Sequence, residues 1–433
     1  MKFYSREDGR ITWRSSRILS IFCLLRDLGV SLLPFPRIPT SLVKILYGVE
    51  PSFIFYVHPR RTEDIYIGFP ILSLVRRIVG RNLFLRLLPI LPPIILGSIK
   101  VGGEVHGLVI SSFVLPIDIM KRTKQSLKLT IRALFLASKL CKGGSVFGLG
   151  GLWPMATRRG LAIDRFAKQK NIVVTNGHCG TLMSLYLAVQ RLSQISKFPL
   201  SDMKVMVLGV GKMGANLVRV LYGKVASITM VDTNEKKLDL LEEKLKATIT
   251  ETDIFKYDNK NDVETLKNLL EKNHVVICTT SNVRRILRQS DVPPNTIFID
   301  DSRPEAIPRD LPNRSVVLEG GLLKIKGIKQ KYNFGIGIDE NVFGCLAEAY
   351  ILAASRDKKL SPSLGDVPLS NFEKMLQVSQ ELGVSTGDFK CKDRIIPDDV
   401  LVRILLGKGN LRHTIPFKHV CWLLKTEELL PIE

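Results

Sequence analysis

The sequence predicts an α/β protein with a doubly wound parallel sheet, and three observations support this fold class. Apolar runs of strand length alternate with helical patterns through the middle of the 433-residue chain. Several of these runs end in small or polar residues, as strands do at the ligand-binding edge of an open sheet. One run leads directly into a G-x-G-x-x-G motif. With 45% hydrophobic and 24% charged residues, the chain has the composition of a globular protein that buries a large core.

The glycine motif follows a strand expected at Val205–Leu208. A helical pattern and a second strand, Ile228–Val231, come next, and an acid follows that strand. This is the dinucleotide fingerprint of a Rossmann domain, in which the glycines allow a tight turn, close approach of a pyrophosphate, and packing of helix on strand. The acid is placed to bind the ribose hydroxyls. The expected cofactor contacts are Gly209, Gly211, Lys212, Met213, Gly214, Asp232, Thr233 and Asn234.

Three more strands are expected further along, at His274–Cys278, Thr296–Asp300 and Val316–Leu318. The carboxyl ends of parallel strands meet along one edge of the sheet, where such sheets bind their ligands. The alternative, a βαβ unit without a nucleotide, is disfavoured by the strand, helix and acid that surround the glycines. Added to the cofactor site on this ground are Thr279, Thr280, Ser281, Asp300 and Gly320.

The pattern divides the chain into four parts. Residues 1–98 form a basic, apolar N-terminal region, residues 99–195 a second α/β domain for the substrate, and residues 196–338 the Rossmann domain. Residues 339–433 are C-terminal helices that return to the substrate domain. Within the substrate domain we expect β structure at Ile99–Leu115, a basic amphipathic helix from Asp118 to about Cys141, and a glycine-rich loop at Gly143–Gly151.

The formal net charge of +22 indicates an anionic partner or surface. The first hundred residues hold 15 Lys and Arg against 6 Asp and Glu, beside long apolar stretches. This combination fits an anionic membrane surface or an acidic carrier protein better than a nucleic acid, and a solvated basic face is the plain alternative. The apolar segment Leu83–Ile99 holds Arg86 and three prolines, so it is not expected to span a membrane. We expect a cytoplasmic protein that is peripheral to a membrane.

Seven cysteines without regular spacing do not describe a disulfide framework, so free thiols in a reducing compartment are expected. No CxxC, HExxH or acidic cluster indicates a metal, and none is predicted.

Cys345 lies at the start of a helical pattern at residues 341–355, after the Rossmann domain. A helix N-terminus favours the thiolate, which is the reactive form of cysteine. Such a thiolate accepts an acyl group from a thioester, and the acyl-enzyme then receives a hydride and releases an aldehyde. From spacing alone, a small core residue is the more common role of a lone cysteine.

Two candidates accompany Cys345. His178 lies in a polar turn at residues 175–181, where it is either a general acid or a hydrogen-bonded structural residue. Glu348 lies one helical turn after Cys345, where it orients a base or holds neighbouring backbone. Weaker candidates are Cys179, for a direct thiol role, and His58, Arg60 and Arg61, for contact with a phosphate.

Several motifs occur together in a recognisable order: GGEVHGLVISSFVLPIDIM, the basic helix, GLGG, the turn at Thr175–Thr181, the fingerprint, VLEGG and FGCLAEA. From about Lys100 to Ser355 they resemble the long-chain fatty acyl-(acyl-carrier-protein) reductases of the cyanobacterial aldehyde pathway. The resemblance implies NADPH-dependent reduction of a fatty acyl thioester to an aldehyde through an acylated cysteine. The family's motif for that cysteine, FACFAEA, matches here at Cys345. An acyl carrier protein or coenzyme A thioester is the implied substrate, and whether an aldehyde-consuming partner enzyme takes the product stays open.

Three departures from the family affect this reading. The family places an arginine suited to a 2′-phosphate after the second strand, whereas this chain has Asp232-Thr233, which favours NADH over NADPH. The histidine of the family's TGNTHT turn is displaced by about one position, which puts an inherited role for His178 in doubt. Residues 1–98 lie outside the resemblance. Two other functions stay open: an alcohol or semialdehyde dehydrogenase similar to shikimate dehydrogenase, and a non-catalytic nucleotide-binding protein at a membrane. The oligomeric state is left open.

Overall fold

The computed structural model describes residues 17–409, except positions 34, 103–104, 247–252, 258–262, 282–285, 303–304, 312–313, 333 and 356–359. The described chain folds into two compact units. Unit 1 contains the residues up to 181 together with residues 323–385, and unit 2 contains residues 182–322 and the residues from 386 onward.

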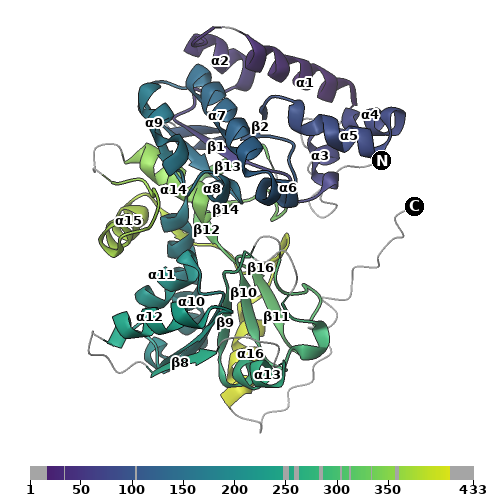
Figure 1. The fold of residues 1–433 in the computed structure, drawn as a ribbon. Helices are drawn as coiled ribbons and strands as arrows, with labels where there is room; N and C mark the ends of the chain where they lie inside the picture. The colour runs from purple at the N-terminus through teal and green to yellow at the C-terminus, as the bar shows by residue number, and fades with distance from the viewer. Residues whose placement is uncertain are drawn as a thin grey trace. The chain divides into compact units, whose positions relative to one another are not determined.

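Unit 2 is built on a six-stranded sheet in the order β11-β10-β9-β6-β7-β8, and every pairing in it is parallel (Figure 1). The order reverses between β6 and β9, which is the topological switch point of a Rossmann sheet. The strands read as continuous apolar runs because both faces of the sheet are covered. Their bounds are β6 Lys204–Leu208, β7 Ser227–Val231, β8 Asp253–Tyr257, β9 Val275–Cys278, β10 Ile297–Asp300 and β11 Val316–Glu319.

Helices cover both faces of this sheet. In Figure 1, α11 and α12 lie to the left of the strands, and α13 and α16 lie in front of them. The hydrophobic core of unit 2 includes one residue from each of four adjacent strands: Met206, Val276, Phe298 and Val317. The helices of this unit are α11 Lys212–Leu221, α12 Glu235–Lys246, α13 Val263–Lys272 and α16 Asp398–Gly409, with short turns η2 Leu200–Asp202 and η3 Gln289–Asp291 and a hairpin of β16 Lys390–Cys391 and β17 Arg394–Ile395.

Unit 1 is built on a second six-stranded sheet, in the order β13-β2-β3-β1-β4-β5. Strands β3, β1, β4 and β5 run parallel, whereas β2 pairs antiparallel with β3, and β13 antiparallel with β2. The bounds are β1 Phe53–Val57, β2 Ile94–Val101, β3 Val105–Ser111, β4 Ser145–Leu149, β5 Ile172–Thr175 and β13 Ile328–Gln330. A smaller sheet, in the order β14-β12-β15, joins Asn341–Phe343, Leu322–Ile325 and Val384–Thr386.

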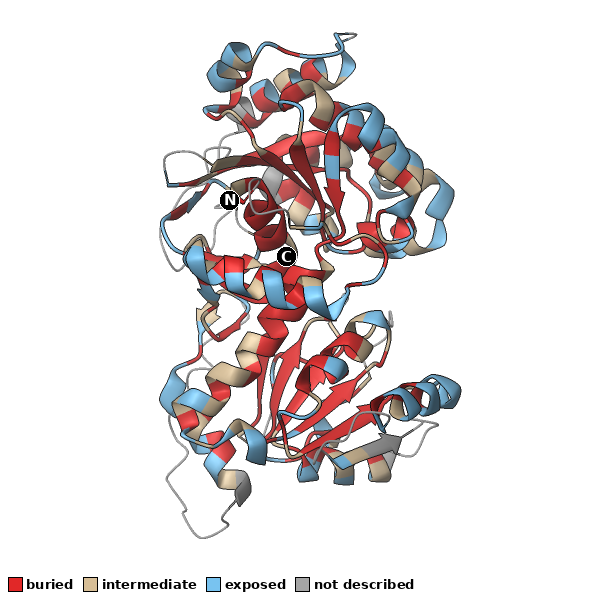
Figure 2. Cartoon of the chain, turned by 90° about the vertical axis from the view of Figure 1, so that its left-hand side faces the viewer, coloured by how far each residue is buried: buried red, intermediate tan, exposed pale blue. Residues whose placement is uncertain are grey.

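The two faces of the unit 1 sheet are covered by different helices. Ile54 and Tyr56 share a core with Ala133 and Ala137 of α7, whereas the alternate residue Phe55 lies on the other face, beside Gly148 and α14. Figure 2 shows the strands of both sheets as buried. The helices are α1 Arg17–Leu32, α2 Thr40–Tyr47, α3 Thr62–Gly68, α4 Ile71–Val79, α5 Arg81–Leu87, η1 Leu88–Ile90, α6 Pro116–Lys121, α7 Thr123–Leu140, α8 Trp153–Ala156, α9 Leu161–Gln169, α14 Gly344–Ala354 and α15 Leu369–Glu381, and α10 His178–Ser196 runs from unit 1 into unit 2.

The expected glycine-rich loop at residues 143–151 is instead strand β4, which lies beside β1 in the sheet. The glycine at its centre is required by packing: a Cβ atom at Gly148 would lie 2.8 Å from the Cβ atom of Ala349 on α14. The glycine therefore lets a helix approach the strand closely and does not mark a loop. The expected helix from Asp118 to Cys141 is likewise two helices, α6 and α7, that meet at Arg122.

The units also differ from the predicted domain ranges. Residues before 98 do not form a separate region, because β1 lies between β3 and β4 and most of β2 precedes Val101 in the same sheet. Residues 386–409 belong to unit 2, whereas the sequence predicts that they return to the substrate domain. Among the described helices, none combines the length and the apolar character needed to cross a membrane.

Candidate functional site

The predicted cofactor residues of unit 2 gather at the carboxyl edge of its sheet. Gly209 follows β6 with φ of +94°, a left-handed conformation that favours glycine, and a Cβ atom there would lie 3.0 Å from the backbone of Thr280. Gly214 packs so closely that a Cβ atom would overlap the carbonyl oxygen of Gly209 and lie 2.8 Å from Thr279 Oγ1. The Thr279 hydroxyl donates to the Gly209 carbonyl oxygen over 2.7 Å, which fixes the turn.

Gly211 differs from both of these glycines. A Cβ atom at Gly211 would meet no protein atom within 4 Å, and its φ of −72° is open to any residue. It immediately precedes α11, whose first residues are Lys212 and Met213, so the backbone N–H groups of a helix N-terminus adjoin this open space. An anion such as a pyrophosphate fits that arrangement, because no contact with another described residue requires glycine at position 211.

Asp232 follows β7, where the adenosine ribose binds in proteins of this fold. The backbone N–H of Asn234 donates to Asp232 Oδ1 over 3.0 Å, and the backbone N–H of Lys237 donates to Asn234 Oδ1 over 3.2 Å. Asn234 thus caps α12, Asp232 orders the turn before it, and Thr233 lies between them. Asp232 is half-buried, and Thr233, Asn234 and Lys237 are exposed.

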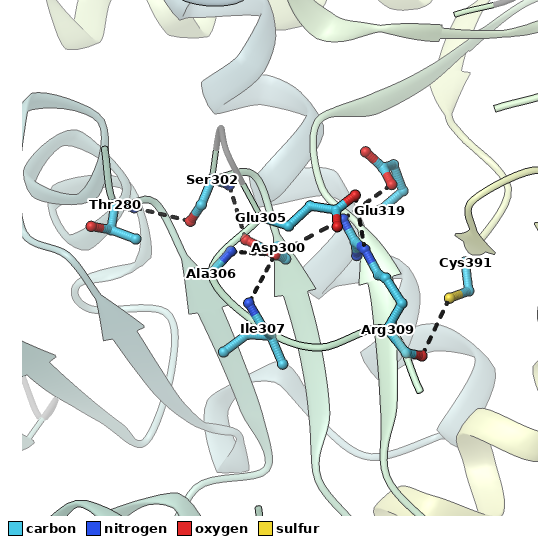
Figure 3. Close-up of polar contacts among 9 residues, drawn as sticks. All are labelled: Thr280, Asp300, Ser302, Glu305, Ala306, Ile307, Arg309, Glu319 and Cys391. Carbon is cyan, nitrogen blue, oxygen red and sulfur yellow. Dashed lines mark hydrogen bonds and ion pairs between the residues drawn. The ribbon is translucent and has the colours of Figure 1, made fainter. Parts of the chain in front are cut away.

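Asp300 is a correction to the predicted cofactor contacts. Its side chain is fully buried at the end of β10, and both oxygens accept hydrogen bonds from the following loop (Figure 3). The N–H of Ser302 donates to Oδ1 over 3.0 Å, and those of Ala306 and Ile307 donate to Oδ2 over 3.1 and 3.4 Å. The carboxylate therefore holds a loop in place. That loop returns to the cofactor edge, where Ser302 Oγ accepts from the N–H of Thr280 over 3.2 Å.

A buried ion cluster lies beside this loop (Figure 3). Glu319 is the register partner of Asp300 on β11, and the Arg309 guanidinium lies 3.2 Å from Glu319 Oε2 and 3.9 Å from Asp300 Oδ2. Glu305 is 3.6 Å from Arg309 Nε. Cys278, the register partner of Asp300 on β9, has a pKa raised by burial and by that carboxylate. No local pattern in the sequence predicts this cluster, because its members are spread over three segments of the chain.

The other predicted cofactor residues at this edge of the sheet are Gly320, Ser281, Thr279 and Thr280. Gly320 packs against backbone, since a Cβ atom there would lie 2.5 Å from the amide nitrogen of Asp301. It therefore serves close packing of β11 on the neighbouring loop. Ser281 is exposed after β9. Thr279 and Thr280 line the edge beside Gly209 as predicted.

Unit 1 carries the second group of candidates, around Cys345. Cys345 lies in the first turn of α14, as the sequence indicated, and its side chain is half-buried. Gly177, with φ of +72°, lies against it: a Cβ atom at Gly177 would overlap the Cβ atom of Cys345 and lie 2.7 Å from its Cα atom. The residue that follows Gly177 is His178, the first residue of α10. The structure thus brings the turn at residues 175–181 and the start of α14 together.

Two further glycines make this close approach possible. A Cβ atom at Gly180 would overlap the carbonyl oxygen of Gly344, and a Cβ atom at Gly344 would overlap the carbonyl oxygen of Gly180. The first turns of α10 and α14 therefore touch through backbone atoms. Any side chain at either position would push the two helix N-termini apart.

Glu348 is the polar centre of this contact, and its side chain is fully buried. The N–H of Gly180 donates to Oε2 over 2.8 Å, the N–H of Ser363 donates to Oε1 over 3.1 Å, and the Thr175 hydroxyl also donates to Oε1. The carboxylate satisfies an N–H group at the start of α10 that has no partner within the helix. Glu348 is therefore a positioning residue that joins the turn, α14 and residues near Ser363.

His178 is held in the same turn. Its backbone N–H donates to Asn176 Oδ1 over 2.9 Å, and the Asn176 amide donates to the carbonyl oxygens of Arg159 and Gly365 over 3.2 Å each. Burial and, to a smaller extent, the positive charge of Arg159 lower the pKa of His178 to about 4, against the opposing effect of Asp366. The imidazole is consequently neutral at pH 7. Of the two roles that the sequence leaves open for His178, a general acid and a hydrogen-bonded structural residue, the first would require the protonated form, which is scarce at pH 7.

The weaker candidates have structural contacts. His58 follows β1, and its Nε2 accepts a hydrogen bond from the N–H of Leu152 over 3.0 Å. The Arg60 guanidinium donates to the carbonyl oxygen of Phe334 over 2.9 Å and lies 5.4 Å from the ring centroid of Phe343, the N-cap residue of α14. Arg60 thus braces the segment that leads to Cys345. Arg61, at the start of α3, is exposed.

The other five described cysteines are buried. Cys179 is fully buried, and burial together with Glu348 raises the pKa of its thiol well above the ordinary value. Cys23, Cys141, Cys278 and Cys391 are buried as well. Among the described residues, no group of three or more His, Cys, Asp or Glu side chains is arranged to hold a metal ion.

A family model for shikimate and quinate 5-dehydrogenases matches residues 191–317, which contain the parallel sheet of unit 2 and its glycine motif. A comparison with curated protein sequences found no match.

Solved structures with some likeness include the nucleotide-binding domain of glutamyl-tRNA reductase from Thermoplasma volcanium, at 20% identity over 32% of this chain and 84% of that chain, with a TM-score of 0.24. Glutamyl-tRNA reductase from Methanopyrus kandleri matches at 14% identity over 68% of this chain and 56% of that chain, with a TM-score of 0.27. The ligand-free 5-ketofructose reductase of Gluconobacter sp. strain CHM43 matches at 10% identity over 83% and 99%, with a TM-score of 0.28. At these values the likenesses carry no argument about activity, and this chain spans little more than half of the Methanopyrus enzyme.

The strand order, the geometry of the three glycines and the family match define an NAD(P)-dependent oxidoreductase with a Rossmann domain. Within that class, its nucleotide-binding part is similar to that of the shikimate and quinate 5-dehydrogenases.

Proposed function

We propose that the protein reduces a fatty acyl thioester to an aldehyde, through an acyl group carried on Cys345. The observation that carries this proposal is the environment of that thiol. Cys345 is half-buried in the first turn of α14 beside the turn that holds His178, whereas the other five described cysteines are buried. The likeness of residues 343–349 to the active-site motif of acyl-(acyl-carrier-protein) reductases supports the same role.

Acyl transfer to Cys345 needs a group that takes the thiol proton. We propose His178 for this role, because it follows Gly177, whose backbone packs against Cys345, and because its imidazole is neutral at pH 7. In the proposed step, the Cys345 sulfur bonds to the acyl carbon, the carbon–sulfur bond to the carrier breaks, and His178 passes the Cys345 proton to the departing carrier thiol. The products are an acyl thioester on Cys345 and the free carrier thiol, and His178 is again neutral.

A nicotinamide cofactor, when bound, supplies the hydride that turns the acyl group into an aldehyde and releases the Cys345 thiol after uptake of a proton. The residues that would hold it are the N–H groups of the turn Gly209–Gly214, with Gly211 open to the pyrophosphate, and Asp232 at the ribose. A carboxylate at the end of β7 repels a 2′-phosphate, so we propose that NADH is preferred over NADPH. Lys236 and Lys237 are exposed nearby and reduce this preference.

The net charge of the protein supports an anionic acyl donor. With a formal net charge of +22, the protein attracts acidic partners, and both acyl carrier proteins and coenzyme A are anionic. We propose an acyl carrier protein or coenzyme A thioester as the acyl donor.

The direct test is to incubate the purified protein with a fatty acyl thioester and to look for acylation by mass spectrometry without cofactor. We expect an adduct on the wild type and none on Cys345→Ala. With NADH or NADPH added, cofactor oxidation and aldehyde release are expected for the wild type alone. The matched control is Cys179→Ala, which removes a fully buried thiol from the neighbouring turn and should keep the adduct on Cys345.

An adduct that persists in Cys345→Ala, or the absence of cofactor oxidation with every acyl thioester tried, would refute the proposal. A second candidate function would then stand on the family match at residues 191–317: oxidation or reduction of a small alcohol or carbonyl compound, as in shikimate dehydrogenases. That chemistry does not use a cysteine, so its activity should survive Cys345→Ala.

A further inference from the structure

Exposed apolar side chains are concentrated in the N-terminal helices of unit 1. Of the 23 large apolar side chains that are exposed in the described residues, 13 lie between Ile21 and Ile90. We call the exposed residues of α1, α2, α4, α5 and η1 in this range the N-terminal apolar face. Its most exposed members are Ile45 at 79%, Ile78 at 77%, Leu32 at 71%, Phe22 at 65%, Ile90 at 65% and Leu25 at 61%.

Helix α1 has apolar residues on both sides. Cys23 and Val30 are buried together with Ser20 and Asp27, whereas Phe22, Leu25 and Leu32, spaced to share the other side of the helix, are exposed. Scattered exposed apolar residues need no explanation, but several on one side of a helix that is already packed on its other side do.

Polar contacts fix this orientation of α1. Asp27 forms an ion pair with Arg26 over 2.8 Å and accepts from the Tyr47 hydroxyl of α2 over 3.3 Å. The backbone N–H of Ile71, at the start of α4, donates to Ser20 Oγ over 3.3 Å. Rotating α1 to bury Phe22, Leu25 and Leu32 would break the contacts of Asp27 with Tyr47 and of Ser20 with Ile71, which are made only in this orientation. The same two contacts join α1 to α2 and to α4, so the exposed residues lie on neighbouring helices.

The charge on this face has one sign. Exposed cations lie among the apolar residues, whereas Asp27 is the only acidic residue in the sequences of α1, α2, α4 and α5, and it is buried. A surface of apolar side chains and cations, without exposed carboxylates, matches the interface of a bilayer with anionic headgroups. The exposed cations are Arg37, Lys44, Arg77, Arg81 and Arg86.

We propose that the N-terminal apolar face docks on the surface of an anionic lipid bilayer, with Phe22, Leu25, Ile45 and Ile78 inserted among the headgroups. This goes beyond the proposed reduction and does not depend on it, because docking is measured without substrate, cofactor or turnover. The protein lies on the bilayer in this proposal and does not cross it.

The test is co-sedimentation of the full chain with vesicles of phosphatidylcholine alone and of equimolar phosphatidylcholine and phosphatidylglycerol. We expect binding to the mixed vesicles, weak binding to the neutral ones, and a decrease with added salt. The double variant Phe22→Ser, Leu25→Ser should lower the partition coefficient about tenfold or more, because two largely exposed side chains lose their burial in lipid. Arg77→Ala with Arg81→Ala should lower binding to the anionic vesicles only.

The matched control is Leu161→Ser with Leu240→Ser, which removes two side chains of similar exposure, 55% and 53%, from helices α9 and α12. It should leave vesicle binding unchanged. Equal losses in both double variants, or no binding to anionic vesicles at low salt, would overturn the proposal. So would a concentration-dependent dimer, seen by light scattering without vesicles, that Phe22→Ser and Leu25→Ser abolish, because the face would then cover a second copy of the chain.

Discussion

The backbone of Gly177 is the surface on which the Cys345 side chain packs: a methyl group at position 177 would lie 2.7 Å from the Cys345 Cα atom and overlap its Cβ atom. Gly177→Ala should therefore displace the thiol and lower stability by about 2–4 kcal/mol, from overpacking and from a left-handed backbone together. Gly144→Ala is the control, because Gly144 has a similar φ of +77° but no neighbour within 4 Å. Thermal unfolding of both variants separates overpacking from the effect of the left-handed backbone. The alkylation rate of Cys345 reports whether the thiol has moved. Equal effects at the two positions would contradict the packing argument.

Gly211→Ala is expected to remove cofactor binding without harming the fold. Its φ of −72° suits alanine and no protein atom would be touched, so stability should stay the same or rise by up to about 1 kcal/mol. The methyl group would occupy the position expected for the pyrophosphate. The Kd for NADH should therefore rise at least about tenfold, which corresponds to about 1.4 kcal/mol of binding free energy. Fluorescence titration measures this change. By contrast, Gly214→Ala should unfold at a lower temperature even without cofactor, because its methyl group would overlap Gly209.

The lowered pKa of His178 predicts a pH dependence of stability. The folded imidazole titrates near pH 4 and the unfolded one near 6.5, so below pH 6.5 only the unfolded chain binds the proton. Stability is therefore lost as the pH falls from 6.5 toward 4, by about 2 kcal/mol at pH 5 relative to pH 7. His178→Asn should lack this component. Urea unfolding of both proteins at pH 7 and pH 5 tests it, and parallel losses would show that another group is responsible.

The buried ion cluster of unit 2 should be sensitive to loss of its cation. Arg309→Met removes the positive charge beside the buried carboxylates of Asp300 and Glu319, which should cost about 3–5 kcal/mol. Adding Glu319→Gln should restore part of that loss. Arg403→Met, which breaks an exposed pair with Asp399 on α16, should cost less than about 1 kcal/mol. Equilibrium unfolding in urea gives all three values, and a small effect of Arg309→Met would mean that water reaches the cluster.

Local patterns predicted the parts of the fold that depend on neighbours in the chain. The fingerprint gave the strand, turn and helix around Gly209, and the helix start placed Cys345 in the first turn of α14. In both cases the signal lies within a few residues, so no knowledge of tertiary packing is needed.

Contacts between segments that are far apart in the sequence explain why other predictions were wrong or incomplete. Gly148 serves α14, which lies two hundred residues further on, so it was mistaken for part of a loop. Asp300 was assigned to the cofactor, although its partners are loop amides and Arg309. The sequence leaves two roles open for Glu348, and its contact with the N–H of Gly180 identifies it as a positioning residue. The burial of Asp27 in α1 has no local signal either, because it depends on the contact with Tyr47 of α2.

The uneven burial of the thiols also makes the molecule convenient to label. Because five of the six described cysteines are enclosed and Cys345 is not, a bulky maleimide dye or a fluorinated tag applied to the native fold should attach at position 345 among them, with Cys421 outside the described residues and replaceable by serine. A single reporter would then sit on α14 beside the turn of Gly177. Its emission or chemical shift would report ligand binding near that turn in real time, without mutation of the five buried cysteines.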